Sequence, residues 1–363
     1  MVEENQVADA KLVPPPTKGH LSIARVSHAW YVVCEAHELG TKPVRVELLG
    51  TPLVLFRDEG GRPAALLDRC PHRNAPLSLG RVVAGGRLEC AYHGWQFEGG
   101  GRCTLVPGLT SGEARERRAP ACATLERAGL VWVWAELDET PTSEPFALAA
   151  TPPPGYARVV HRVEAPGTLH ATLENALDVP HTAFLHRGLF RGAGKRNEIR
   201  ATVRRSADRV EVEYAGEPRP SGAVGYILSP SGGTVEHWDR FILPSIAQVE
   251  YRLGRESHLL VTAFGTPVSD FVTRLFAVVD FRSPLPSFLV RPLLEPVALS
   301  IFRQDARMLG AQSEVVRAFG GEQYMSTELD LIGPHIWRLL KQAEAGERAP
   351  DETSVEREVR FLA

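Results

Sequence analysis

The sequence predicts an α+β fold in which an N-terminal antiparallel β domain precedes a larger antiparallel sheet with helices. Three observations support this prediction. The 363 residues include 32 glycines and 28 prolines, which favour turns and short strands over a helical bundle. Hydrophobic residues (44%) and charged residues (23%) are in the range of ordinary globular proteins. Short β-rich runs fill the first third of the chain, and helical stretches appear only later.

Charge and terminal sequence limit the classes of partner. Lys and Arg number 41 and Asp and Glu 44, a net charge of −3, so the composition gives no case for nucleic-acid or anionic-membrane binding. The first residues are acidic and polar rather than signal-like. The apolar stretch 288–302 is interrupted by Arg291, Pro292, Glu295 and Pro296. Five cysteines, an odd number, favour reduced thiols or metal ligands. We therefore expect a cytoplasmic protein without a membrane anchor.

The first domain is expected over residues 20–138, after a loose leader at residues 1–19. Hydrophobic runs separated by Gly-rich turns predict a small antiparallel sandwich or barrel that closes near Leu137. Its clearest predicted strands are residues 30–34, 44–48, 52–56 and 130–134. A segment rich in Pro, Ser, Thr and Ala follows and is interpreted as a linker over residues 139–155.

The second domain is expected over residues 156–363. A helical stretch is predicted near residues 168–187. The predicted strands lie near 197–214, 223–228, 236–252, 257–266 and 272–281, and further helices near 297–319 and 325–345. This order predicts a long antiparallel sheet that holds helices against it.

The first group of candidate ligands lies in the first domain. Cys70 and His72 form a C-x-H pair, and Cys90 and His93 form a C-x-x-H pair. Such tight spacing requires ligands at the tips of loops. Two cysteines and two histidines could hold zinc, or a [2Fe–2S] cluster with thiolates on one iron and imidazoles on the other.

The two loops resemble the ligand loops of Rieske iron–sulfur domains, since Arg73 follows the first pair and Gly94 and Trp95 follow the second. Rieske proteins of respiratory complexes carry an additional cysteine in each loop, where this chain has Ala75 and Tyr92. The resemblance is therefore to the Rieske domains of oxygenases. The other three cysteines, Cys34, Cys103 and Cys122, are interpreted as small hydrophobic residues.

The second group of candidate ligands lies in the predicted helix near 168–187. Asp178 and His181 share a helical face, but His181 and His186 lie about 140° apart around a straight helix. Pro180 is expected to kink or break the helix, so that the two imidazoles can converge. Two histidines need a carboxylate to complete a 2-His-1-carboxylate iron site.

The D-x-x-H-x-x-x-x-H spacing is similar to that of the catalytic domain of Rieske non-haem iron oxygenases. That resemblance implies a third ligand far downstream, for which Asp305 is the first candidate and Asp270, Asp280 and Asp330 are rivals. Gln304-Asp305 with a later glutamine, Gln312, is similar to the subgroup of pheophorbide a oxygenases and vanillate demethylases.

The resemblance also gives Asp178 a role of its own, as a bridge between His181 and the Rieske histidine His93 of a neighbouring chain. A solvated helix-face carboxylate is the alternative. Asn175 is matched to an asparagine that supports the iron site in some family members, with Glu174 as the alternative. The remaining histidines that we considered are interpreted as structural, pocket-lining, hydrogen-bonded or exposed: His161, His170, His237 and His258.

Taken together, the resemblance implies a Rieske domain followed by a helix-grip (START-like) catalytic domain. It implies a terminal oxygenase that takes electrons from NAD(P)H through a separate ferredoxin or flavin reductase, by way of the [2Fe–2S] cluster, to a mononuclear Fe(II) that activates O2. The expected reaction is monooxygenation, by hydroxylation, demethylation or oxidative cyclisation, of a largely apolar or aromatic small molecule, and the expected assembly is a homotrimer. A Rieske-type electron carrier with a non-catalytic small-molecule-binding domain is the competing hypothesis, and a zinc hydrolase is a third.

Overall fold

The computed structural model describes residues 24–110, 116–186, 198–217, 235–254, 257–347 and 354–362. The predicted leader and the predicted strand at residues 223–228 lie outside this part of the chain. Within it, no helix combines the length and the apolar character needed to cross a membrane.

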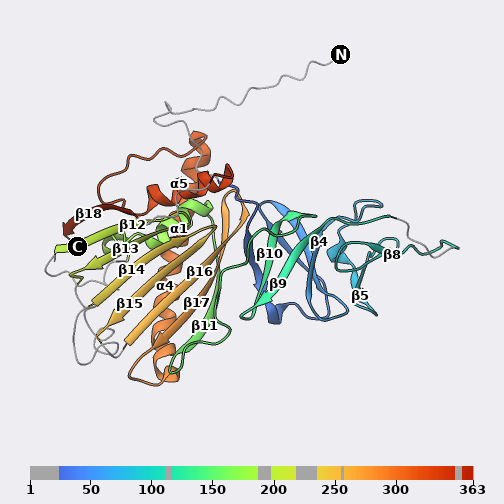
Figure 1. Ribbon diagram of the computed structural model, residues 1–363, viewed down its shortest axis with the longest axis horizontal. Coiled ribbons are helices and arrows are strands. Elements are labelled where there is room, and N and C mark those ends of the chain that lie inside the picture. The colour runs from blue at the N-terminus through green and yellow to red at the C-terminus, as the bar shows by residue number, and fades with distance from the viewer. Residues whose placement is uncertain are drawn as a thin grey trace, which may run out of the picture.

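Two antiparallel sheets form the N-terminal domain (Figure 1). The larger has the order β1-β10-β9-β4-β3-β2 and consists of β1 (Trp30–Glu35), β2 (Val44–Leu48), β3 (Thr51–Arg57), β4 (Pro63–Leu67), β9 (Ala121–Arg127) and β10 (Leu130–Leu137). The smaller has the order β5-β6-β7-β8 and consists of β5 (Arg81–Val83), β6 (Arg87–Glu89), β7 (Gln96–Phe97) and β8 (Cys103–Leu105). Short 3-10 helices occupy Ala36–Glu38 (η1) and Leu77–Leu79 (η2). All four strands predicted for this domain are present.

The second domain is built on one eight-stranded antiparallel sheet of order β11-β17-β16-β15-β14-β13-β12-β18 (Figure 1). Its strands are β11 (Ala157–Ala165), β12 (Glu198–Arg205), β13 (Arg209–Ala215), β14 (Val235–Ile242), β15 (Ile246–Leu253), β16 (Ser257–Ser269), β17 (Val272–Arg282) and β18 (Ser354–Leu362). The predicted strands at 197–214 and 236–252 are each a hairpin of two strands. The sequence predictions missed β11 and β18.

In the described part of this domain, four helices accompany the sheet: α1 (Leu169–Leu177), α2 (Thr182–Leu185), α4 (Ser287–Phe319) and α5 (Gly333–Glu344). Helix α4 begins ten residues before the predicted start at 297, although Pro292 and Pro296 lie inside it. Both prolines are exposed, so the carbonyl groups that they leave unpaired can bind water. Helix α5 begins eight residues later than predicted.

The two domains share buried apolar side chains. One continuous cluster joins Val33 and Leu55 of the N-terminal sheet to Leu173 of α1 and Phe241 of β14. On the opposite face of the eight-stranded sheet, the rings of Trp132 (β10) and Phe264 (β16) meet edge to face at 5.0 Å. This shared core fixes the N-terminal domain against one end of the sheet.

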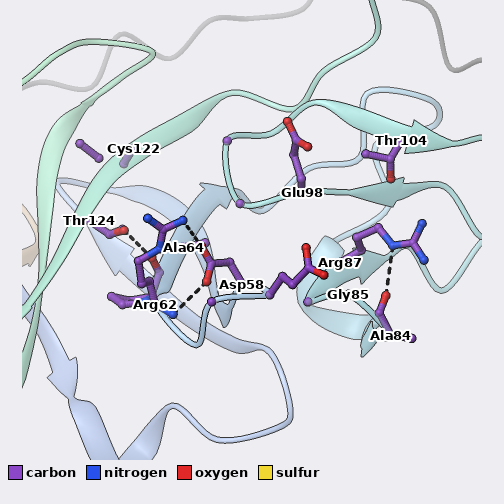
Figure 2. Close-up of a pocket in the computed structure, with 17 residues that line it drawn as sticks. Asp58, Arg62, Ala64, Ala84, Gly85, Arg87, Glu98, Thr104, Cys122 and Thr124 are labelled. Atoms are coloured by element: carbon purple, nitrogen blue, oxygen red, sulfur yellow. Dashed lines mark hydrogen bonds and ion pairs between the residues drawn. The ribbon is translucent and has the colours of Figure 1, made fainter.

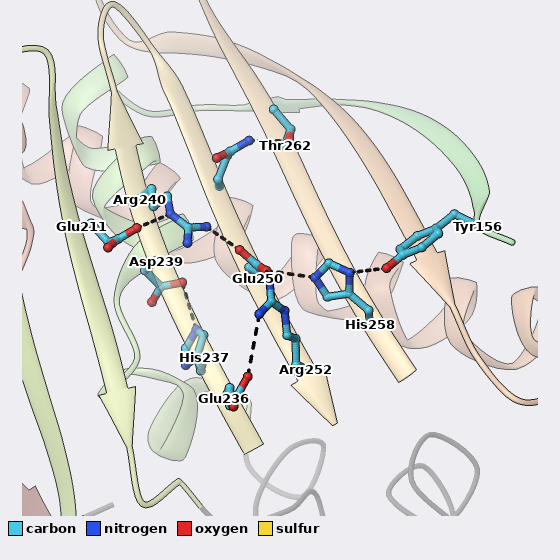
Figure 3. Close-up of polar contacts among 11 residues, drawn as sticks. Tyr156, Glu211, Glu236, His237, Asp239, Arg240, Glu250, Arg252, His258 and Thr262 are labelled. Atoms are coloured by element: carbon cyan, nitrogen blue, oxygen red, sulfur yellow. Dashed lines mark hydrogen bonds and ion pairs between the residues drawn. The ribbon is translucent and has the colours of Figure 1, made fainter. Parts of the chain in front are cut away.

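The rest of that outer face carries a chain of charged and polar side chains across neighbouring strands (Figure 3). Arg240 donates to Glu250 Oε2 at 2.7 Å, and Glu250 Oε1 lies 3.0 Å from His258 Nε2. His258 Nδ1 in turn lies 2.6 Å from the hydroxyl of Tyr156. His258 is therefore hydrogen-bonded on both ring nitrogens, as its sequence interpretation allowed.

Candidate metal centres

The two Cys-His loops have the same backbone turn. The N–H of Cys70 donates to the carbonyl of Ala75, and that of Cys90 to the carbonyl of Trp95, both at 2.8 Å. The carbonyl of each cysteine accepts the N–H of the residue four positions later, which has a left-handed φ of 61° at Asn74 and 68° at Gly94. The loops therefore present their cysteine and histidine side chains from two matched turns.

The side chains of these loops converge. Cys70 and Cys90 are both buried, at 2% exposure, in the apolar cluster that the four-stranded sheet forms with β3 and β4. The rings of His72 and His93 lie 4.5 Å apart, edge to face. Burial, together with the adjacent Cys90, raises the pKa of Cys70 to about 11 against the lowering effect of the His72 backbone N–H.

These residues fit an iron–sulfur cluster. His72 Nδ1 is buried and has no hydrogen-bond partner, an unusual state for a ring nitrogen that a metal bond would resolve. The thiols need a cation to become thiolates in such an apolar setting. His93 is exposed, so one imidazole of the group lies at the protein surface.

A stack of rings leads away from His72. Trp95 lies parallel to His72 at 4.8 Å between ring centroids, and the guanidinium of Arg117 lies 5.6 Å from the Trp95 ring. In the sequence, Trp95 is only one residue of the loop pattern, and no motif indicates Arg117. Only the folded chain shows that the two residues meet.

The second group forms where α1 ends. Asp178 caps the helix in an extended conformation (φ −93°, ψ 109°), and α2 begins after His181. Pro180 explains the break because it disfavours a helical conformation of the residue before it. His181 and His186 consequently flank the short helix α2, as its N-cap and C-cap residues, and their Nε2 atoms approach to 3.2 Å.

The carboxylate of Asp305 on α4 completes a compact group. Its Oδ1 lies 3.1 Å from His186 Nε2 and 3.6 Å from His181 Nε2. Metal–ligand bonds of about 2.1 Å at right angles place ligands about 3.0 Å apart. The three side chains are thus spaced as three ligands on one face of a metal ion would be.

The hydrogen bonds of the two histidine Nδ1 atoms determine what this group can bind. His181 Nδ1 lies 3.2 Å from Asp178 Oδ2, and His186 Nδ1 lies 2.9 Å from Gln304 Oε1. Since both partners are acceptors, the Nδ1 atoms carry hydrogen, and in neutral rings the Nε2 lone pairs face each other and Asp305. A cation relieves that repulsion. Burial lowers the pKa of His181, but Asp178 and Asp305 outweigh it and raise the pKa to about 9, so the site favours positive charge.

Asn175 and Glu174, next to each other on α1, make different contacts. Asn175 Nδ2 donates to Asp305 Oδ1 at 3.4 Å, which agrees with the preference for Asn175 over Glu174. Glu174 instead packs against the backbone of Gly333 in α5, where a Cβ would lie 1.7 Å from its Oε1. Burial raises the pKa of Glu174 to about 7, with Asp178 and Asp330 adding to the effect.

The rival carboxylates point elsewhere. Asp270 forms a bidentate ion pair with Arg25. Asp280 forms another with Arg158 on the outer face of the sheet. Asp330 accepts hydrogen bonds from the backbone and the side chain of Thr327.

Three other histidines singled out in the sequence make their contacts away from the metal group. His170 Nε2 lies 3.1 Å from the carbonyl of Gly333. His161 lies 3.8 Å from Glu295. His237 is buried between Glu217 and Asp239, at 2.8 and 3.0 Å, and stacks between Tyr214 and Tyr251.

The remaining cysteines and the N-terminal cleft do not join either group. Cys34, Cys103 and Cys122 are buried and free, and burial raises the pKa of Cys34 and of Cys122 to about 12. An open cleft of about 950 Å³ lies between the β3–β4 and β5–β6 turns (Figure 2). It is lined by charged and small residues, Arg87 among them, and by none of the candidate ligands.

Two family models match the chain. The Rieske [2Fe-2S] domain model matches residues 29–123, and the model of the vanillate O-demethylase oxygenase C-terminal domain matches residues 163–346. The first match contains both Cys-His loops. The second contains His181, His186 and Asp305.

Curated relatives match part of the chain. Chlorophyllide a oxygenase of Chlamydomonas reinhardtii is 40% identical over 40% of this chain and 22% of its own length. The oxygenase component of dicamba O-demethylase from Stenotrophomonas maltophilia is 34% identical over 45% of this chain and 48% of its own. The matched segments thus span from about a fifth to about half of the first relatives. A crystal structure of dicamba monooxygenase bound to 3,6-dichlorosalicylic acid aligns with a TM-score of 0.74 at 25% identity, over 89% of this chain and 98% of that one. NdmB of Pseudomonas putida aligns with a TM-score of 0.72 at 22% identity.

Proposed function

The chain belongs to the family of Rieske oxygenase terminal components, and from that premise we propose that it is an O2-dependent monooxygenase supplied with electrons by a separate ferredoxin or flavin reductase. The observation that carries the proposal is the triad of His181, His186 and Asp305, whose metal-facing atoms all lie within 4.8 Å of one another. These residues would hold a mononuclear iron, and that iron would supply the chemistry of O2 activation.

The roles of the residues follow from their contacts. Cys70, His72, Cys90 and His93 would hold the [2Fe–2S] cluster, which stores and passes single electrons. His181, His186 and Asp305 would hold Fe(II). Asp178 and Gln304 hold the rings of the two iron-binding histidines by hydrogen bonds to Nδ1, and Asn175 orients Asp305. Residues 20–138 would form the electron-accepting domain and residues 156–363 the catalytic one, joined by the linker 139–155.

Hydroxylation consumes O2, two electrons, two protons and substrate, and yields hydroxylated product and water, whereas oxidative cyclisation from the same inputs yields cyclised product and two waters. The electrons derive from NAD(P)H through the reductase. We propose a largely apolar or aromatic small molecule as substrate, with hydroxylation, demethylation or oxidative cyclisation as its outcome. Two relatives named as O-demethylase and N-alkylformylase components support oxidation at an O- or N-alkyl group.

We also propose a homotrimer in which electrons cross between chains. In Figure 1 the six-stranded sheet separates the four-stranded sheet, which carries the cluster loops, from α1. A route from His93 of one chain to Asp178 and His181 of the next would avoid that separation. The three buried cysteines outside the cluster loops, Cys34, Cys103 and Cys122, suit a reducing cytoplasm, although several relatives carry chloroplastic names.

Iron quantitation on the purified protein tests the proposal. We expect about three irons per chain, two in the cluster and one mononuclear. His181→Ala should remove one iron and leave the cluster absorption unchanged, whereas His37→Ala, at an exposed histidine of η1, should remove none. Two irons in both the parent and His181→Ala would favour the electron-carrier hypothesis. Zinc in the triad without O2 uptake would favour the hydrolase.

Substrate identity requires a second measurement. O2 consumption by the holoenzyme, with a surrogate reductase and NADH, is to be followed across a panel of methoxy- and N-methyl-substituted aromatic compounds. Formaldehyde release equimolar with O2 uptake would identify demethylation. O2 uptake without product would indicate uncoupled turnover and point to a different substrate.

A further inference from the structure

The residues that pack beside His72 differ from those that pack beside His93. Arg117, Trp95 and His72 follow one another from the exposed guanidinium to the half-buried imidazole, at 5.6 and 4.8 Å. His93 instead packs against the exposed ring of Tyr92, at 3.8 Å between centroids. The two imidazoles of the ligand group are therefore bordered by different surface residues.

Three arginines adjoin His72, two in its own loop and one through the ring of Trp95. Arg69, Arg73 and Arg117 are all exposed. Arg69 donates to the neutral amide of Asn74 at 2.7 Å, and Arg117 lies over Trp95. Within the described ranges, no ion pair with a carboxylate is found for these three arginines, and Glu116 is the acidic neighbour of Arg117 in the chain.

Other arginines of the same domain are neutralised. Arg81 pairs with Glu89 at 2.7 Å, Arg102 with Glu98 at 2.9 Å, and Arg118 with Asp138 at 2.5 Å. Those pairs leave little local field. The three arginines near His72 keep their charge available for an anionic surface.

We propose that Arg69, Arg73, Arg117 and Trp95 form the docking surface for an acidic one-electron carrier protein of the [2Fe–2S] ferredoxin class. This proposal rests on the proposed function, because it assigns the side on which the cluster is reduced. In the step, the reduced ferredoxin loses one electron and the oxidised cluster gains it, with no bond made and no proton transferred. Trp95 lies between the docked donor and His72, whereas His93 remains available to a neighbouring chain.

Charge and aromatic character support this occupant. A cluster of arginines without ion pairs to described carboxylates attracts an acidic partner over several ångströms and raises the association rate about 10- to 1,000-fold at low salt. Arg and Trp are also the side chains that are most enriched at binding hot spots. A flat indole stacked on a ligand imidazole gives the donor a short contact route to the cluster.

The test is the rate at which the cluster of the holoenzyme is reduced by an acidic plant-type [2Fe–2S] ferredoxin, followed by stopped-flow absorption. Arg117→Glu should lower the second-order rate constant about 10-fold at an ionic strength of about 0.01 M, and the difference should vanish near 1 M, where the screening length falls to about 3 Å. Arg87→Glu is the matched control, since Arg87 lines the cleft in Figure 2 and donates only to the carbonyl of Ala84. It should change the rate less than 2-fold by the same reasoning.

The reduction rate should not fall with a small cationic reductant, the methyl viologen radical. It should reduce the cluster of Arg117→Glu at least as fast as that of the parent, because a positive charge has been removed. Trp95→Phe should preserve most of the ferredoxin rate, and Trp95→Leu should lower it. Sedimentation of each variant should match the parent.

Distinct results would overturn the proposal. Equal ferredoxin rates for the parent and Arg117→Glu, or equal losses in Arg117→Glu and Arg87→Glu, would exclude this docking surface. A changed oligomer in Arg117→Glu would assign the surface to contacts between copies of the chain. Absence of a reducible cluster absorption in the parent would instead contradict the proposed function, so the two failures are distinguishable.

Discussion

His186 Nδ1 lies 2.9 Å from Gln304 Oε1, although the two residues are 118 positions apart in the chain. Gln304 precedes Asp305 on α4, so one dipeptide supplies both a carboxylate for the metal group and the acceptor that orients an opposing imidazole. This part of α4 therefore supplies one candidate ligand, Asp305, and orients a second one, His186.

Replacement of Gln304 should weaken metal binding without disturbing the cluster. Gln304→Ala removes the acceptor for the His186 Nδ1 hydrogen, and loss of such a supporting bond costs about 10- to 100-fold in metal affinity. Competitive Fe(II) titration under argon measures the change. Gln312→Ala, at an exposed glutamine of the same helix, is the control and should keep parental affinity. Equal affinities in all three proteins would show that Gln304 does not support the site.

The contact between α1 and α5 should be sensitive to one methyl group. Gly333→Ala places a Cβ 1.7 Å from Glu174 Oε1 and 2.5 Å from its Cδ, so the Glu174 carboxylate or α5 must move. Overpacking of this kind costs about 1–3 kcal/mol. The midpoint of urea unfolding measures the loss.

A double-mutant cycle separates this clash from a general effect on α5. In a Glu174→Ala background the same Gly333→Ala change should cost much less, since the carboxylate is absent. Additive losses in the cycle would mean that Glu174 is not the group displaced.

The sequence predicted the local chemistry of the second site better than its surroundings. Pro180 was expected to end the helix, and α1 ends at Leu177, because the residue before a proline avoids the helical conformation. Asp305 could be proposed only beside its rivals Asp270 and Asp280. The pairing of Asp280 with Arg158 depends on the register of β11 against β17, and that of Asp270 with Arg25 on the approach of two segments far apart in the chain, neither of which one sequence reveals.

The missed elements have a physical reason of their own. Strand β18 reads Ser-Val-Glu-Arg-Glu-Val-Arg-Phe-Leu, and four of its nine residues are charged. Edge strands often carry such charges, which makes them resemble solvated segments. Pairing with β12, some 150 residues earlier in the chain, gives β18 its structure. Likewise, nothing in the sequence around Trp95 indicates that its ring stacks on His72.

The buried imidazole of His237 should make stability depend on pH. Burial lowers its pKa, but Asp239 and Glu217 outweigh that effect and raise the pKa to about 9. Since the folded value exceeds the unfolded value of about 6.5, the stabilisation is fully present below pH 6.5 and is lost as pH rises through about 9. A shift of this size corresponds to about 3 kcal/mol.

Thermal unfolding of the parent and of His237→Gln between pH 6 and pH 9.5 checks this expectation. The parent Tm should fall more steeply across that interval than the Tm of the variant. His161→Gln, on β11 of the same sheet, should retain the parental slope. Parallel curves for the parent and His237→Gln would show that the imidazole is not held protonated in the folded protein.

Asp178 should govern electron transfer between chains and not metal content. Asp178→Asn keeps an acceptor oxygen near His181 Nδ1, at 3.2 Å in the parent, but removes the charge that would join His181 to His93 of a neighbouring chain. After reduction of the cluster alone, its reoxidation by O2 in the presence of substrate should slow about 10- to 100-fold, the range typical of supporting residues at metal sites. Asp208→Asn, in the turn between β12 and β13, is the control and should reoxidise at the parental rate. If Asp178→Asn loses its mononuclear iron in proportion to the rate, the carboxylate acts on the metal site within its own chain, and the proposed route between chains is wrong.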